Sequence, residues 1–388
     1  RPPALPTPKP PSGRRSAVFL LLLLVVVGLN LIGLVMVLSA SSVNGLHHHD
    51  SSWYHFKRQA VWSALGGVSL LLTLRVDYHR WRRFAGPGLL ASLGALLLVL
   101  TPGLGVEVNG ASRWLGVGPL QFQPSELAKL AVLVFVADLL ARRLDRMRDT
   151  QATLRPVMVV SGAVAALLML QPNLGTTIIV GAIVLVLLFV AGAPLGRLSA
   201  LAGGGFVAAT ALALSASYRR ARVLAFLHPN DDPTDTGYQT LQSWLAIASG
   251  RLTGVGIGAS RAKWGFLPFA HTDFIFAIIA EEFGLVGAGF VVLLFVAIGV
   301  LGALTALRAP DPFGMLLASG ITAWLLVQAF VNIGAVVGIL PITGVPLPFV
   351  SFGGSSLCVG MGAVGILLNI ARQARWRTPT PTMACAER

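Results

Sequence analysis

The sequence predicts an all-α integral membrane protein that crosses the bilayer about ten times. The chain of 388 residues is 55% hydrophobic and has a mean hydropathy of +0.77. Only 11% of its residues are charged, against about 25% in soluble domains. Ten long apolar runs follow one another along the chain, and an open structure satisfies its own backbone in lipid only as a helix. These observations exclude a soluble globular protein.

The apolar runs approach or exceed the length of about 20 residues that a membrane-spanning helix needs. Their approximate cores are residues 17–38, 60–74, 86–100, 127–140, 157–170, 176–190, 198–215, 274–304, 314–337 and 353–370. The first run follows Arg14 and Arg15 as a signal peptide would. It is too long for one and lacks a small-residue cleavage site, so we interpret it as a membrane anchor.

The spans are predicted to form one domain at 17–371, between two polar tails. The Pro-rich tail at 1–16 is expected to be disordered, and a second tail occupies 372–388. Basic residues stay on the cytoplasmic side of a membrane, and with the N-terminus inside, the inner segments hold 19 of the 29 Lys and Arg residues. Both termini are therefore predicted to be cytoplasmic, and a long loop at about 216–273, between the seventh and eighth spans, to be extracytoplasmic.

Composition also limits the chemistry. The net charge of +14 reflects 15 acids as much as 29 bases, and we expect no nucleic-acid partner. Cys358 and Cys385 provide neither a disulfide framework nor a Cys-based zinc site. Three histidines at 47–49 precede Asp50 in a predicted Ser-rich loop, where solvated polarity is favoured over metal binding. The metal ligands, if any, are unknown from the sequence.

The long outer loop contains one helical pattern. Leu241, Trp244, Leu245 and Ala248 recur at helical spacing, which predicts a short amphipathic helix at the lipid interface. A helix that only caps the bundle fits equally well. Glycines at 250, 254, 256 and 258 follow, without the strand and helix that flank a phosphate-binding loop, so we interpret this stretch as a flexible hinge.

Asp273 is the acid in the most suggestive surroundings. It directly precedes the apolar run that begins at Phe274, and Arg261 and Lys263 lie about ten residues before it. A carboxylate beside cations at a membrane edge suits group transfer from a lipid diphosphate, because the attacking hydroxyl needs a base and the leaving group needs positive charge. The alternative is structural, since Asp is a preferred N-cap and a helix is predicted to begin at the next residue.

Other charged residues lie inside predicted spans. Glu126 and Lys129 are an i,i+3 pair at the start of the fourth span, and they are expected to neutralise each other either as a structural ion pair or at a functional site. Glu281 and Glu282 lie within the eighth span and are expected to face the bundle or a partner. The Pro- and Gly-rich stretch at 341–354 interrupts the helical pattern, which is tolerated only where protein or a cavity surrounds it.

Five segments together resemble one family of membrane proteins. They are QFQPSELAK at 121–129, QPNLGT at 171–176, GYQTLQS at 237–243, HTDFIFAIIAEE at 271–282 and NIGAVVGILPITGVPLPFVSFGGSS at 332–356. On these motifs the chain resembles the SEDS family, which includes FtsW and RodA. The resemblance implies a ten-helix peptidoglycan glycosyltransferase that polymerises lipid II outside the membrane with a class B penicillin-binding protein. It also implies that Asp273, in the HTDF motif, is the catalytic residue.

The two lines of reasoning define an expected site. Asp273 would deprotonate or orient the sugar hydroxyl that attacks the lipid-linked glycan, and cations would hold the departing undecaprenyl diphosphate, with a divalent cation (Mg²⁺ or Mn²⁺) as a plausible cofactor. The expected substrate-binding residues are Arg113, Trp114, Glu126, Lys129, Arg219, Arg222, Gln239, Lys263, His271 and Ser355.

Two positions depart from the family pattern. Where the family often has the glutamate of LPExHTDF this chain has Phe269, and where it has the aspartate of QPDLGT this chain has Asn173. If those acids bind a metal or orient substrate, then either Glu126, Glu281 or Glu282 replaces them or the activity of this chain is impaired.

The cellular role is less sharply predicted than the family. The run GLVMVLSASSV at 33–43 resembles FtsW more than RodA, whereas 346–349 resembles RodA as much. We therefore expect a division role at the septum of the cytoplasmic membrane, with other division proteins as partners. The alternatives are a RodA-type elongation polymerase, a lipid II flippase and a scaffold without an active site.

Overall fold

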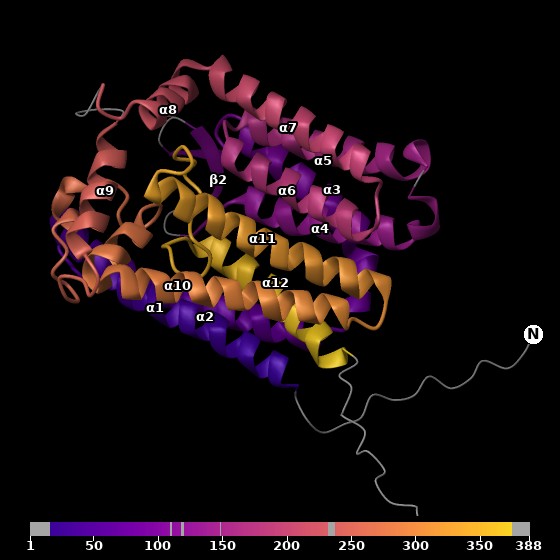
Figure 1. Cartoon of the computed structure of the whole chain (residues 1–388), viewed down its shortest axis with the longest axis horizontal. Coiled ribbons are helices and arrows are strands. Elements are labelled where there is room, and N and C mark those ends of the chain that lie inside the picture. The colour runs from indigo at the N-terminus through magenta and orange to yellow at the C-terminus, as the bar shows by residue number, and fades with distance from the viewer. Residues whose placement is uncertain (1–15, 109–110, 118–119, 148, 232–236, 375–388) are drawn as a thin grey trace, which may run out of the picture.

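The computed structural model describes residues 16–374, apart from 109–110, 118–119, 148 and 232–236 (Figure 1). The predicted tails at 1–16 and 372–388 fall almost entirely outside these residues. The helices are α1 (Ala17–His49), α2 (Tyr54–Arg75), α3 (Trp81–Leu100), α4 (Pro124–Ala141), α5 (Arg155–Leu170), α6 (Leu174–Val190), α7 (Leu195–Ser215), α8 (Ser217–Leu227), α9 (Tyr238–Gly250), α10 (Ile275–Leu307), α11 (Pro312–Val337) and α12 (Gly354–Gln373). Shorter helical turns are η1 (Tyr78–Arg80), η2 (Leu144–Arg146), η3 (Thr150–Leu154) and η4 (Ala262–Phe266).

Each of the ten predicted apolar runs lies on one of these helices, in order: α1 to α7, then α10 to α12. Seven helices in the described part of the chain are long and apolar enough to cross a membrane, and α6 is a shorter apolar helix. Helices α2 and α4 are not among the seven, because α2 begins with polar residues and α4 contains charged ones. The prediction of an all-α polytopic membrane protein is therefore confirmed, while the number of ten spans stays a prediction.

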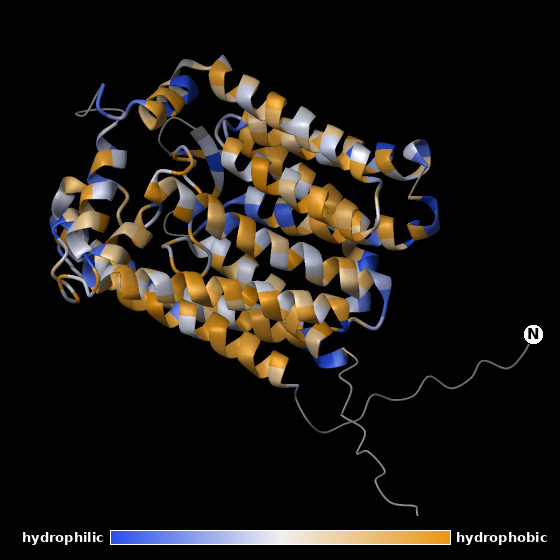
Figure 2. Ribbon diagram, viewed as in Figure 1, coloured by the Kyte–Doolittle hydropathy of each residue, from blue (hydrophilic) through white to orange (hydrophobic). Residues whose placement is uncertain are grey.

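The outer surface of the bundle is apolar, as lipid contact requires. Large side chains such as Leu24, Leu90, Phe206 and Leu293 are mostly exposed. Figure 2 shows hydrophobic colouring along the length of the helices and hydrophilic colouring concentrated near their ends. An apolar surface of this extent does not occur on a soluble monomer, so the chain is a multi-pass membrane protein.

Small residues allow the helices to pack closely. α2 and α12 run side by side, and a Cβ added to Gly365 would lie 2.0 Å from Oγ1 of Thr73. In the same interface a Cβ on Gly354 would lie 2.3 Å from Cε2 of Trp62. Close helix approach through glycine is typical of membrane proteins, where helix association depends on packing.

The connection between α3 and α4 corrects the all-helical expectation locally. It forms an antiparallel three-stranded sheet of β1 (Gly105–Val108), β2 (Ala111–Val117) and β3 (Leu120–Phe122), in the order β1-β2-β3. Trp114 pairs with Val106, and Leu115 pairs with Phe122. The Asn-Gly pair at 109–110 between apolar residues is a hairpin signal in the sequence. The sheet lies next to α3 and α4 and carries Arg113.

The predicted loop at 47–50 is wrong. α1 continues through these residues to His49, and Asp50 ends the helix in the left-handed conformation, where its N–H bonds to the carbonyl of Gly45. Helix propagation adds one hydrogen bond per residue, so the helix extends past its apolar core into the Ser- and His-containing stretch. Across the described residues there is no group of three or more His, Cys, Asp or Glu side chains that could hold a metal ion.

α9 and the following loop pack against α10, which is interrupted at Gly284 (φ +66°). The carbonyls of Glu281 and Glu282 accept hydrogen bonds from the N–H groups of Val255 and Gly256. Beyond the interruption, the N–H groups of residues 285 and 286 donate to the carbonyls of residues 251 and 252. The loop thus supplies the partners that the broken helix lacks.

This packing corrects the hinge interpretation of the loop glycines. A Cβ on Gly254 would lie 2.1 Å from the carbonyl oxygen of Glu282, and one on Gly250 would lie 1.9 Å from that of Ala280. The glycines are needed for close backbone approach. The predicted helix is present as α9, and its face of Trp244, Leu245 and Ala248 is exposed while the opposite face packs on the bundle.

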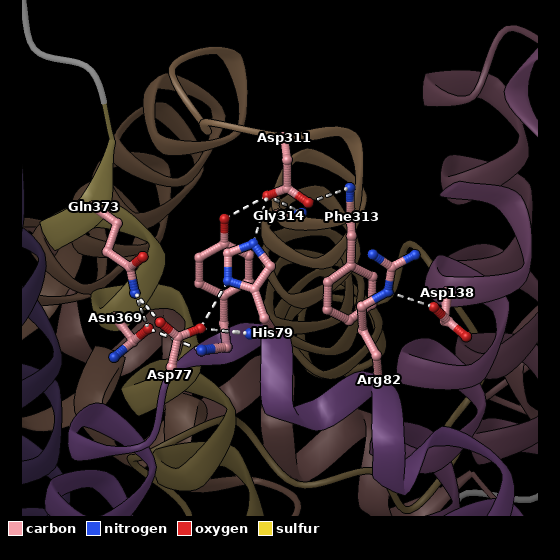
Figure 3. Close-up of polar contacts among 10 residues, drawn as sticks. Asp77, His79, Arg82, Asp138, Asp311, Phe313, Gly314, Asn369 and Gln373 are labelled. Carbon is pink, nitrogen blue, oxygen red and sulfur yellow. Dashed lines mark hydrogen bonds and ion pairs between the residues drawn. The ribbon is translucent and has the colours of Figure 1, made fainter. Parts of the chain in front are cut away.

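The bundle has two chemically different ends. At the end where α1 begins and α12 ends, called here the terminal end, hydrogen bonds join the α2–α3 connection to the α10–α11 connection and to α12 (Figure 3). The hydroxyl of Tyr78 donates to Asp311, and Asn369 accepts from the N–H of Tyr78 (3.1 Å) and donates to the carbonyl of Leu74 (2.7 Å). The opposite end, where α10 begins and α11 ends, carries Asp273 and is called the Asp273 end.

Candidate functional site

Asp273 lies directly before α10 but does not cap it. The N-cap residue is Phe274, and no side chain bonds to the free N–H groups of the first turn. The Asp273 carboxylate accepts no hydrogen bond from any residue in the described part of the chain and is partly exposed. The capping interpretation is therefore wrong, and this carboxylate has no structural task there.

The backbone around Asp273 is held tightly even though its side chain is not. Ser351 donates its hydroxyl to the carbonyl of Thr272 (2.6 Å), and the N–H of Phe352 donates to the carbonyl of His271 (3.0 Å). Asn332 on α11 donates to the carbonyls of Asp273 and Val345, at 2.8 Å each. Residues 271–273 are thus clamped by α11 and by the irregular segment 338–353, of which residues 345 and 347–351 are buried in the protein.

A cleft opens beside the carboxylate. It is small, with room for about one water molecule, and Asp273, Asn332 and Gly344 are among the residues that line it. A Cβ added to Gly344 (φ +70°) would lie 3.7 Å from the carboxylate oxygen of Asp273. Glycine keeps the space in front of the acid open.

Two arginines act on Asp273 from neighbouring elements. Burial raises the pKa of Asp273 to about 6, and the charges of Arg222 and Arg113 oppose that rise. Arg113 on β2 donates to the carbonyls of Gln171 (3.0 Å) and Pro172 (2.7 Å), and Arg222 on α8 donates to the carbonyl of Ile342 (3.4 Å). A carboxyl group with a pKa near 6 is well matched to proton transfer close to neutral pH.

The Glu126–Lys129 pair is present and deeply buried. Lys129 is only 1% exposed, and its ammonium lies 2.9 Å from Glu126 and 2.8 Å from the side-chain oxygen of Gln328. Gln328 in turn donates to the carbonyl of Pro346 (2.9 Å). The predicted mutual neutralisation is confirmed, and the pair supports the segment that clamps Asp273.

Lys263 and the two acids of α10 form another buried group. The Lys263 ammonium lies 3.4 Å from Glu282 and also donates to the carbonyl of Gly258. Glu282 accepts from Ser39 (2.6 Å) on α1, and Glu281 accepts from Ser260 and from the N–H of residue 261. Both acids face the protein, as predicted. Lys263 is thus engaged in holding the loop after α9 to α1 and α10.

The remaining predicted residues are spread around the Asp273 end. Trp114 on β2 and Gln239 on α9 are partly exposed. Arg219 on α8 has one buried guanidinium nitrogen without a hydrogen-bond partner among the described residues. His271 packs against the ring of His55, 4.6 Å between centroids, and burial together with His55 lowers its pKa to about 4. Ser355 is buried in the first turn of α12.

Comparison with known proteins identifies the family. A family model described as "Cell cycle protein", covering FtsW, RodA and SpoVE, matches residues 19–376. The chain belongs to the FtsW/RodA/SpoVE family. The protein named "Probable peptidoglycan glycosyltransferase FtsW" from Geobacter metallireducens is 41% identical over 92% of this chain and 95% of its own length.

Solved structures of the FtsW/RodA/SpoVE family agree with the fold. A chain from a structure described as "Structural coordination of polymerization and crosslinking by a peptidoglycan synthase complex" aligns with a TM-score of 0.74 and 32% identity, covering 91% of this chain and 97% of that one. The rod shape determining protein RodA of Thermus thermophilus aligns with a TM-score of 0.67 and 31% identity, covering 92% and 97%. The resemblance in the sequence motifs is thereby confirmed.

One departure from the FtsW/RodA/SpoVE pattern has a structural explanation. Asn173 is the N-cap of α6, where its side-chain oxygen accepts from the N–H of Thr176 (3.3 Å). Asn and Asp are about equally good caps, so this replacement keeps the local fold. Phe269 lies in a turn with φ +58° and is partly exposed, and its side chain supplies no carboxylate at that position.

Sequence reasoning missed several residues that organise the site. Asn332 and Gln328 lie one turn apart on α11, and both donate to backbone carbonyls of the irregular segment 338–353. Gln59 on α2 donates to the carbonyl of Ser351 (3.3 Å). The available signal was the presence of amide side chains inside apolar runs, which marks a buried polar contact in a membrane protein.

Proposed function

We propose that this chain is a peptidoglycan glycosyltransferase that polymerises lipid II at the outer face of the cytoplasmic membrane. The observation that carries the proposal is Asp273, whose carboxylate accepts no hydrogen bond from the described residues, has a raised pKa, stands on a backbone fixed by Asn332 and is acted on by two arginines. The names of its relatives support the same activity.

The reaction joins two lipid-linked sugars. Asp273 accepts the proton of the acceptor sugar hydroxyl as its oxygen bonds to the anomeric carbon of the donor glycan. The bond between that carbon and the diphosphate oxygen breaks, and its electron pair leaves with undecaprenyl diphosphate. Arg113 and Arg222 are placed to neutralise this anion, and their anchoring to backbone carbonyls keeps them in position as charge develops.

A divalent cation, Mg²⁺ or Mn²⁺, is part of the proposal as a cofactor. Mg²⁺ is commonly bound by one or two carboxylates together with substrate phosphates, and Asp273 is the carboxylate at this site that is free of hydrogen bonds to described residues. The ion would add positive charge beside the diphosphate. Arg113 and Arg222 hold their positions without it.

The protein is proposed to act in cell division with a class B penicillin-binding protein and other division proteins. The sequence is 41% identical to the relative named FtsW and 31% identical to RodA. A single partner helix is proposed to dock on the lipid-facing sides of α10 and α11. Phe330, which is 60% exposed, is the suitable probe. Glu282 is unsuitable because it is buried against Lys263.

Both termini are proposed to lie in the cytoplasm, which puts the Asp273 end outside. Reporter fusions after Arg146 and at the C-terminus should report a cytoplasmic location, and a fusion near Asp231 an external one. An internal location at Asp231 would contradict the mechanism, because no outer-leaflet glycan would reach Asp273.

The decisive experiment supplies purified protein with lipid II, with and without a cognate class B penicillin-binding protein, and measures glycan polymer. Polymer formation supports the enzyme. A flippase would instead move labelled lipid II between the leaflets of protein-containing vesicles and make no polymer under any partner condition. A scaffold would do neither.

A further inference from the structure

The first turn of α12 has the properties of an anion-binding site. Its N-cap is Gly353, and no side chain bonds to the free N–H groups of the turn. Ser355 in this turn is 1% exposed, and its hydroxyl has no hydrogen-bond partner among the described residues. A helix N-terminus carries partial positive charge and presents N–H groups to an anion. A buried hydroxyl without a partner is costly, which indicates that a ligand completes this turn.

A cation from α2 lies against the residue that precedes the N-cap of α12. The guanidinium carbon of Arg58 is 5.9 Å from the centre of the Phe352 ring, and the same guanidinium donates to the hydroxyl of Tyr54 (3.4 Å). Gln59 fixes this part of α2 by donating to the carbonyl of Ser351, and Trp62 covers Gly354. Arg58, Trp62, Phe352 and Ser355 are called here the α2–α12 corner.

The corner is joined to the Asp273 backbone but draws on different charges. The N–H of Phe352 bonds to the carbonyl of His271, two residues before Asp273. Arg113 and Arg222, which act on Asp273, come instead from β2 and α8. Of the other expected cations, Lys129 and Lys263 are paired with buried acids, and Arg219 lies on α8 with Arg222. The cation of the corner therefore comes from a different element than the cations that act on Asp273.

The proposed reaction requires two such sites, because the donor and the acceptor are both lipid diphosphates. An anion of this charge at a membrane edge is costly unless a cation neutralises it. We infer that the α2–α12 corner binds the diphosphate of the acceptor lipid, while Arg113 and Arg222 face the leaving diphosphate of the donor. This assignment rests on the proposed function, since only a polymerase holds both lipids at once.

The test is a binding titration of the full-length chain with Asp273→Asn in phosphatidylcholine nanodiscs. The probe is radiolabelled undecaprenyl diphosphate. We expect two classes of binding site. Arg58→Gln should remove one class, and Arg222→Gln the other. Ser355→Ala should weaken the Arg58-dependent class by about tenfold, as loss of a hydrogen bond to a charged group does. Lys57→Gln and Ser356→Ala, neighbours on the same two helices, should change neither class by more than about twofold.

Retention of both classes in Arg58→Gln would overturn the proposal. The titration is repeated in nanodiscs containing phosphatidylglycerol. If this anionic phospholipid displaces the probe from the Arg58-dependent class, the corner is a phospholipid site and the acceptor assignment is wrong.

Steady-state kinetics distinguish the proposed acceptor site from the proposed glycosyltransferase function. With Asp273 intact, Arg58→Gln should raise the KM for lipid II about tenfold and leave kcat within about threefold of wild type. An unchanged KM would contradict the acceptor role. If the wild-type chain makes no polymer with any partner, the proposed function fails, and the titration alone decides whether the corner binds a diphosphate.

Discussion

At the terminal end, carboxylates serve as structural fasteners, whereas at the Asp273 end the central carboxylate is left unbonded. Asp311 accepts from Tyr78 and caps α11 through the N–H groups of Phe313 and Gly314, and Asp138 pairs with Arg82 at 2.7 Å (Figure 3). Asp273 accepts nothing from the described residues, although its backbone is fixed by Asn332. The difference teaches that an ordered backbone does not require a bonded side chain. An acid such as Asp273, with a fixed backbone and an unbonded carboxylate, is available for chemistry.

The largest expected effect is that of Asp273→Asn. Loss of a general base typically lowers the rate about 10²- to 10⁴-fold, and we expect at least that loss in polymer formation. Because Asp273 does not cap α10, expression should match the wild type and thermal stability should not fall below it. Asp311→Asn is the matched control and should keep near-normal turnover. Near-normal polymerisation by Asp273→Asn would move the search for the base to Glu126.

The pH profile sharpens the same contrast. Asp273 with a pKa of about 6 must be deprotonated to act as a base, so the rate should fall about tenfold per pH unit below 6. The stability effect has the opposite sign. A raised pKa means that the folded state favours the protonated acid, so its stabilising contribution is lost as pH rises from about 4 through 6. Asp273→Asn should therefore gain thermal stability relative to wild type over that window. A rate independent of pH between 5 and 7 would contradict this assignment.

Two buried asparagines allow a matched test of positioning. Asn332 and Asn369 each donate to backbone carbonyls of other segments, one at each end. Asn332→Ala should lower kcat about 10- to 100-fold, because small displacements of a catalytic group are costly, with a smaller change in KM. Asn369→Ala should lower thermal stability comparably but leave the turnover of folded protein within about twofold. Equal kcat losses in both variants would indicate a purely structural role for Asn332.

Asp311→Ala should affect stability alone. It removes the cap of α11 and leaves the buried Tyr78 hydroxyl without its acceptor. These losses sum to about 1–3 kcal/mol, measurable as a lower unfolding temperature in detergent. Asp311→Asn keeps the cap and should lose less. A drop in turnover of folded Asp311→Ala would show that the two ends are coupled.

The smallest effect is expected for Asn173→Asp, which restores the residue common in the family. The cap on α6 is kept, and the stability change should be below about 1 kcal/mol. Thermal unfolding measures this directly. A several-fold change in lipid II polymerisation would reveal a substrate role that the capping geometry does not include.

The sequence predicts the helical framework because hydropathy determines it. All ten predicted apolar runs fall on helices, and Asp273 was identifiable from its place at the edge of such a run beside a family motif. The contacts of Asp273 were not predictable, since capping depends on whether the helix begins at residue 274 or 275. The sheet at 105–122 was overlooked because its short strands are weak signals beside long apolar runs.

Contacts between residues that are far apart in the sequence could not be predicted either. The Lys129–Glu126 pair follows from helical spacing, but the partners of Lys263 on α1 and α10 depend on the tertiary fold. The contact between Arg58 and Phe352 could not be predicted either, because the two residues lie almost 300 positions apart in the sequence. Long-range neighbours of this kind become visible only when α2 and α12 are packed together.

The interruption of α10 at Gly284 bears on how the protein is made. The groups that complete the broken helix come from residues 251–256, only about 30 positions earlier in the chain. These contacts have low contact order, and local contacts form quickly. The contacts between the loop after α9 and α10 can therefore form during synthesis, before α11 and α12 have been made. The later helices then pack around Asp273 against a part of the protein that is already folded.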